Sequence, residues 1–205
     1  ETAYQQDMGI SNDFIPVENA HPQSGGGMAM GDLVADPEIP AATVLLTALY
    51  VRLLQPPTRG EQSAQVQRGE TLFAEIGCAS CHVPMMRTGK NPIPELSEVD
   101  AHLYSDLLLH DMGDELADKD MNGNITNKEW KTPPLWGIGL VKIVNKHTRF
   151  LHDGRAGSIE EAILWHDGEA RNAKNNYISL NKENREKLLF FLYFLKYKIL
   201  NHHNQ

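Results

Sequence analysis

The sequence has little that would cross-link it, anchor it in a membrane or bind it to a nucleic acid. Its 205 residues contain only two cysteines, Cys78 and Cys81, so a disulfide-stapled scaffold is excluded. No apolar run reaches the roughly 18 residues of a membrane span; the longest candidate, residues 41–54, is shorter and contains Arg52. Positive charge is also scarce. The 19 Lys and Arg against 27 Asp and Glu give a net charge of −8, which argues against a nucleic-acid binder.

What is present fits a folded globular chain. Hydrophobic residues make up 41% and charged residues 22%, and the length allows one or two domains with a buried core. The acidic balance suits a basic protein partner or a cationic ligand. The chain starts at Glu1 without an initiator Met or a signal-peptide pattern. We therefore expect a mature protein or an excised part of a longer one.

The distribution of helix and turn signals predicts an all-α fold with long loops. Residues 1–40 are rich in Gly, Pro, Asn and Asp and predict an extended N-terminal arm or inter-domain segment, while residues 41–205 predict one domain. Gly77 favours a helix end, and the capping box that begins at Ser158 favours a helix start. No strand pair is evident. The predicted helices are residues 41–54, 63–76, 158–168 and 181–200.

Cys78-Ala-Ser-Cys81-His82 is the attachment signature of c-type haem. Two intervening residues let one helical turn aim both sulfurs at the porphyrin edge, and His82 then falls beneath the iron as the proximal ligand. A zinc ribbon would need a second ligand pair, and a thioredoxin-type redox pair would need a βαβ context; the sequence offers neither. We therefore predict one covalent haem c. Its attachment outside the cytoplasm implies a periplasmic or otherwise exported protein.

Several sequence blocks in a fixed order resemble one family. They begin with Arg-Gly-Glu-Thr-Leu-Phe before the haem motif and end with Phe-Leu-His-Asp-Gly-Arg-Ala. The pattern is similar to the C-terminal haem domain of di-haem oxidoreductases, also called thiol oxidoreductase-like, which are relatives of bacterial di-haem cytochrome c peroxidases. The blocks are residues 68–73, 78–84, 107–113, 129–137 and 150–156, with residues 7–11 similar to the inter-domain segment of the family.

The resemblance implies a cytochrome c-like haem domain in which a helix before the motif crosses the C-terminal helix. Gly69 would permit that close approach. Family members carry two haem motifs and this chain carries one, so the resemblance implies that the second haem belongs to an upstream domain. In the peroxidase relatives the upstream haem holds the peroxide site and the C-terminal haem admits electrons. The function implied here is electron entry, with a redox partner protein or a second haem domain as partner.

The sixth iron ligand has several candidates. His166 has the best pattern, because Ile159, Ala162, Ile163 and His166 share one helix face that should point inward. The resemblance agrees, since the relatives place a distal Met at this distance after a His-Asp-Gly turn. Met112 is the runner-up, and Arg155 is a candidate partner of a haem propionate. The remaining candidates are Met85, Met86, His102, His110, His147 and His152, whereas His21, His202 and His203 lie in segments expected to be mobile.

An acidic loop follows the template of an EF-hand calcium site. Oxygen-bearing residues fall at the template positions, and Gly123 allows the sharp turn. The Thr-Pro-Pro that follows forbids a normal exiting helix, so a solvated acidic turn is the alternative. The candidate calcium ligands are Asp118, Asp120, Asn122, Asn124, Thr126 and Glu129.

Three functions are compatible with these features. The first is a c-type cytochrome domain that relays electrons, with His82 and His166 on the iron. The second is a stand-alone mono-haem peroxidase, which needs an open sixth position and a polar distal acid or base, with His110 or His152 as candidates. The third is a docking or sensor domain stabilised by haem and calcium.

Overall fold

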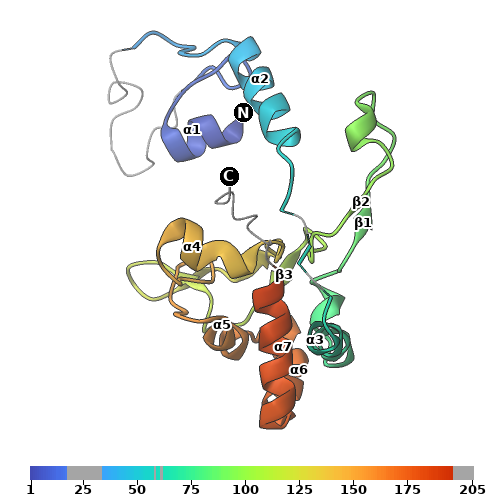
Figure 1. The fold of residues 1–205 in the computed structure, drawn as a ribbon. Helices are drawn as coiled ribbons and strands as arrows, with labels where there is room; N and C mark the ends of the chain where they lie inside the picture. Colours follow the sequence, from blue (N-terminus) through green and yellow to red (C-terminus); the bar gives the residue numbers. More distant parts are fainter. Residues whose placement is uncertain (18–33, 58, 61, 196–205) are drawn as a thin grey trace. The chain divides into compact units, whose positions relative to one another are not determined.

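The computed structural model describes residues 1–17, 34–57, 59–60 and 62–195. These residues belong to two compact units, Glu1–Pro56 and a second unit that begins at Pro57 (Figure 1). His21, His202, His203 and the predicted end of the last helix lie outside the described residues.

The first unit contains two helices, α1 (Thr2–Met8) and α2 (Ala41–Arg52). Helix α2 confirms the helix predicted over residues 41–54. Helix α1 falls within the segment predicted to be an extended arm, and it ends at Gly9 in the left-handed conformation with φ 72°. Between the helices, Asn12 forms backbone bridges with Ile15 and with Ile39, so the described part of residues 1–40 folds back on itself.

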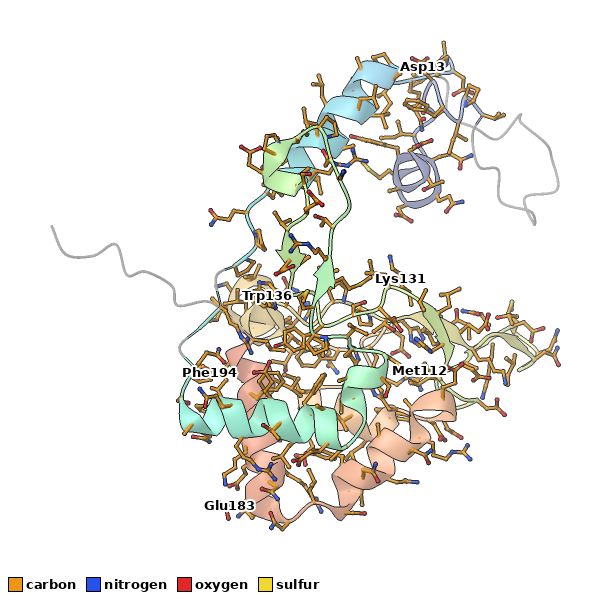
Figure 2. All side chains as sticks on the ribbon, turned by 90° about the vertical axis from the view of Figure 1, so that its right-hand side faces the viewer. Asp13, Met112, Lys131, Trp136, Glu183 and Phe194 are labelled. Carbon is orange, nitrogen blue, oxygen red and sulfur yellow. The ribbon has the colours of Figure 1, made fainter. Side chains whose placement is uncertain are left out.

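The core of the second unit forms where α3 (Ala64–Glu75) packs against α7 (Lys182–Phe194) (Figure 1). Gly69 lies at the crossing, where a Cβ atom would lie 2.3 Å from the Lys187 carbonyl oxygen and 2.5 Å from the Phe191 Cβ. The predicted crossing at Gly69 is therefore confirmed. Trp136 and Phe194, both labelled in Figure 2, pack against this core. Its buried residues are Val66, Leu72, Phe73, Ile76, Tyr104, Ile159, Tyr177, Leu188, Phe191, Leu192 and Leu195.

The residues that predict helix starts and ends have the capping geometry expected of them. The Ser63 side chain accepts a hydrogen bond from the Val66 amide at the start of α3, and Gly77 follows its end with φ 95°. Ser158 caps α5 (Ile159–Trp165) in the same way, through the Glu161 amide. Helix α5 ends before the predicted Gly168, since His166 already has an extended ψ of 130°.

The prediction of an all-α fold is wrong: the protein is mixed α/β, with three two-stranded antiparallel sheets in the described residues. Each strand is only two or three residues long, too short to show the alternation of apolar and polar residues by which a strand is recognised in a sequence. The pairs are β1 (Met86–Arg87) with β2 (Asp100–Ala101), β3 (Leu109–Asp111) with β6 (Glu129–Lys131), and β4 (Asp118–Lys119) with β5 (Ile125–Asn127).

Short helices complete the second unit. Only α6 among them exceeds five residues, and it precedes α7 directly. In the part of the chain that the structure describes, none of the helices has the length and apolar character needed to cross a membrane. The short elements are the 3₁₀ helices η2 (Cys78–Ser80), η3 (Pro94–Leu96), η4 (Ile138–Leu140) and η5 (Gly168–Ala170), and the α-helices α4 (Val141–Asn145) and α6 (Arg171–Ser179).

Candidate haem site

The Cys-x-x-Cys-His motif forms a single helical turn directly after α3. Residues Cys78–Ser80 are a 3₁₀ helix, and the His82 amide donates a 3.0 Å hydrogen bond to the Cys78 carbonyl. Gly77 makes the turn possible, because its φ of 95° lies in the region that favours glycine. The motif therefore has the local geometry that the spacing predicts.

The two thiols are not in an environment that activates cysteine. Burial raises the pKa of the Cys78 thiol to about 12. Burial also raises the pKa of Cys81, and the carboxylates of Asp106 and Glu169 raise it further. Since the thiolate is the reactive species, a pair of protonated thiols disfavours the thioredoxin-type alternative.

His82 is oriented as a ligand by its backbone partner. Its Nδ1 lies 3.0 Å from the Tyr104 carbonyl oxygen, an acceptor, so Nδ1 carries the proton and Nε2 offers a lone pair. Burial lowers the pKa of His82 to about 4. The imidazole is therefore neutral near pH 7, which is the state that binds a metal.

Tyr104 is itself fixed at both ends. Its ring is fully buried and packs edge-on against Phe73 and Phe191. Its hydroxyl donates to Glu70 Oε1 at 2.8 Å and accepts from Arg59 at 3.1 Å, while Arg59 and Glu70 form an ion pair at 2.7 Å. This network holds the carbonyl that orients His82, as second-shell groups do at metal sites.

The imidazole of His166 lies next to that of His82. It follows α5, and its Nδ1 lies 2.7 Å from the Ala162 carbonyl oxygen. Burial lowers its pKa as well. The ring centroids of His82 and His166 lie 6.5 Å apart with an interplanar angle of 46°. Among the described residues, no hydrogen bond involves Nε2 of either ring.

This spacing fits one metal ion between the two rings. A metal–imidazole bond is about 2 Å long, and a ring nitrogen lies roughly 1.2 Å from its ring centre, so two opposed imidazoles on one ion have centres roughly 6.4 Å apart. The observed 6.5 Å agrees. The donor set of two neutral imidazoles and two adjacent cysteines therefore fits a covalently attached haem.

The other candidate axial ligands have different surroundings. His102 stacks on Trp136 with centroids 5.8 Å apart, and His152 stacks on Trp130 at 3.6 Å. His147 accepts a hydrogen bond from the Arg149 amide. The side chains of Met85 and Met86 are exposed. The runner-up Met112 is partly buried, and its amide donates to the Lys128 carbonyl. Only His166 has an aromatic contact with His82 among these candidates.

Arg155, the predicted propionate partner, is engaged by protein groups. Its guanidinium pairs with Asp153 at 2.5 Å, donates to the Glu115 carbonyl, and lies over the Trp165 ring at 4.8 Å from the centroid. Its role toward haem stays a prediction.

The predicted calcium loop is a hairpin between β4 and β5. Asp120 accepts hydrogen bonds from the amides of Asn122 and Asn124 and from the Asn124 side chain. The carboxylates of Asp118, Asp120 and Glu129 do not gather within 4.8 Å of one another in the described structure. Glu129 belongs to β6, which pairs with β3. The structure therefore brings Asp120 together with Asn122 and Asn124 but not with the other two carboxylates. Calcium binding stays a prediction.

One cluster was not predicted from the sequence. The Cys81 sulfur, an Asp106 carboxylate oxygen and a His110 ring nitrogen lie within 4.8 Å of one another. His110 also reaches Glu169 on the far side of its ring. The sequence marks His110 alone, as a candidate axial ligand or distal acid or base within residues 107–113. Its partners Asp106 and Glu169 are brought to it by tertiary structure.

Comparison with known families decides the relationship of this chain. The family model described as "Di-haem oxidoreductase, putative peroxidase" matches residues 7–195. The chain belongs to this di-haem oxidoreductase family. The suspected resemblance is thus confirmed, and membership of this family supports a redox role that involves haem. Neither a curated protein nor a solved structure matches this di-haem oxidoreductase.

Proposed function

We propose that this chain holds one haem covalently through Cys78 and Cys81, with His82 and His166 as its axial ligands, and that it relays electrons within a di-haem oxidoreductase. One observation carries the proposal. Two neutral imidazoles, each with Nδ1 committed to a backbone carbonyl, lie 6.5 Å apart beside the attachment motif.

Bound haem supplies a one-electron couple, whose potential depends on its axial ligands. The residues of the chain hold and orient the two imidazoles that would ligate the iron. The Tyr104 carbonyl holds the Nδ1 proton of His82, and the Ala162 carbonyl holds that of His166. Both bonds make the ligating imidazoles more basic and fix their orientation. Phe73, whose ring centroid lies 6.3 Å from that of His82, adds apolar cover.

The partner is a second haem-bearing domain or a redox protein. The family is di-haem, and this chain carries a single attachment motif. The net charge of −8 favours a basic contact surface on the partner. Because covalent haem attachment takes place outside the cytoplasm, we place the protein in the periplasm or another exported compartment. The stand-alone peroxidase alternative needs an open sixth position, the position that His166 would fill.

The test is spectroscopic. The purified ferric protein should show the optical and EPR spectra of six-coordinate low-spin bis-histidine haem, without the weak far-red band of methionine-ligated haem. His166→Ala should give high-spin ferric iron that binds cyanide. His152→Ala serves as the control, because His152 stacks on Trp130, and its spectrum should remain that of the wild type. A His166→Ala variant with an unchanged low-spin spectrum would exclude His166 as ligand.

A further inference from the structure

His110 lies between two carboxylates. It is the central residue of β3, and its Nε2 lies 2.8 Å from Asp106 Oδ2 while its Nδ1 lies 2.8 Å from Glu169 Oε2. Carboxylate oxygens accept and do not donate, so each contact requires a proton on the ring nitrogen. The arrangement therefore describes an imidazolium bridging two carboxylates, and these bonds, first that to Glu169, raise the pKa of His110.

One end of this bridge is tied to the haem-attachment motif. The Asp106 amide donates a 2.8 Å hydrogen bond to the Cys81 carbonyl, and the neighbouring Ser105 amide donates to the Val83 carbonyl at 3.0 Å. The segment that carries Asp106 thus runs alongside the motif that carries His82. The Asp106 side chain also caps the Leu108 amide, which fixes its carboxylate.

The other end is tied to the segment that follows His166. Glu169 uses its second oxygen, Oε1, to accept from the Asp111 amide at 3.1 Å. Gly168 has a φ of +55°, and a Cβ there would lie 2.2 Å from the Asp111 carbonyl oxygen. This turn therefore packs tightly on the end of β3. Since α5 ends at Trp165, these contacts hold the chain directly after His166.

We propose that Asp106, His110 and Glu169 form a latch, a set of positioning residues that holds the segment after His166 against the haem-attachment motif. The latch slows the departure of His166 from the iron and so controls how fast an external small ligand gains the sixth position. This inference rests on the proposed function, because it takes His166 as the axial ligand. It adds that the latch keeps the sixth position closed to external ligands.

Cyanide binding to the ferric protein measures the latch directly. At saturating cyanide the observed rate equals the rate at which His166 leaves. Glu169→Gln keeps the size of the side chain but removes its charge. We expect it to keep the low-spin resting spectrum and to raise the limiting rate by about three- to tenfold, as loss of a charge-assisted hydrogen bond should. His110→Gln should raise the rate similarly.

A matched control and a double variant separate this role from a general loss of stability. Glu183→Gln removes an exposed carboxylate that pairs with Lys187 at 2.6 Å on α7 (Figure 2), and its cyanide rate should equal that of the wild type. In a His166→Ala background, Glu169→Gln should have no further effect, because the latch acts through His166. Limiting rates of Glu169→Gln and His110→Gln equal to wild type would overturn the latch. An unchanged spectrum of His166→Ala would instead overturn the axial assignment.

Discussion

His82 and His166 belong to different parts of the second unit, yet their ring centroids lie 6.5 Å apart. His82 comes directly after the turn that follows α3, whereas His166 comes directly after α5. Each ring has a backbone carbonyl on its Nδ1, so in each ring Nε2 carries the lone pair that a metal would bind.

Replacing His166 with methionine should raise the midpoint potential. Imidazole stabilises ferric iron, whereas a thioether favours the ferrous state. We expect a rise on the order of 100 mV, a fraction of the roughly 0.8 V range set by axial ligands. Spectroelectrochemical titration measures it. His152→Met, which alters the ring stacked on Trp130, should leave the potential near the wild-type value. A potential that does not move in His166→Met would contradict bis-histidine ligation.

Gly69→Ala should destabilise the folded protein by about 1–3 kcal/mol, because overpacking a close helix crossing forces the backbones apart. The added Cβ would lie 2.3 Å from the Lys187 carbonyl oxygen. Urea denaturation of the haem-loaded protein measures the loss. Gly89→Ala is the control, since a Cβ there has no described atom within 4 Å. Equal stability of the two variants would show that the helices can separate at no cost.

The stability contribution of His110 should depend on pH in a defined direction. The carboxylates of Glu169 and Asp106 raise its folded-state pKa above the unfolded value of about 6.5. Its contribution is then fully present below about pH 6.5 and is lost as pH rises through the folded-state pKa. The difference in unfolding free energy between wild type and His110→Gln should shrink across that interval. A difference that is constant from pH 6 to pH 9 would argue against the charged bridge.

If residues 118–129 bind calcium, calcium should stabilise the folded protein. Calcium at about 100 times its Kd would add about 2.7 kcal/mol to the free energy of unfolding, because it binds only the folded state. Chelation should then lower the melting temperature, and Asp120→Ala should abolish that sensitivity. A melting temperature that responds to neither calcium nor chelator would leave residues 118–129 a hairpin held by the hydrogen bonds of Asp120.

Some features could be predicted because they depend on neighbours in the chain. Ser63 and Ser158 cap the amides three residues ahead, and Gly77 takes the conformation that ends α3. The Cys-x-x-Cys-His spacing forms a single turn for the same reason. The strands could not be predicted because two or three residues are too few to show a period of alternation. For β3, the pairing partner β6 is also distant in the sequence.

The attachment motif, the helix boundaries near their caps and the order of blocks that resembles the family can all be read from residues close together in the chain. That His166, among the candidate ligands in the described residues, lies beside His82, and that His110 meets Asp106 and Glu169, follows from the packing of segments distant in the sequence. The two kinds of feature differ in the sequence separation of the residues that make them. Caps and turns form between residues a few positions apart, whereas these side chains come from segments far apart in the sequence and meet only in the folded chain.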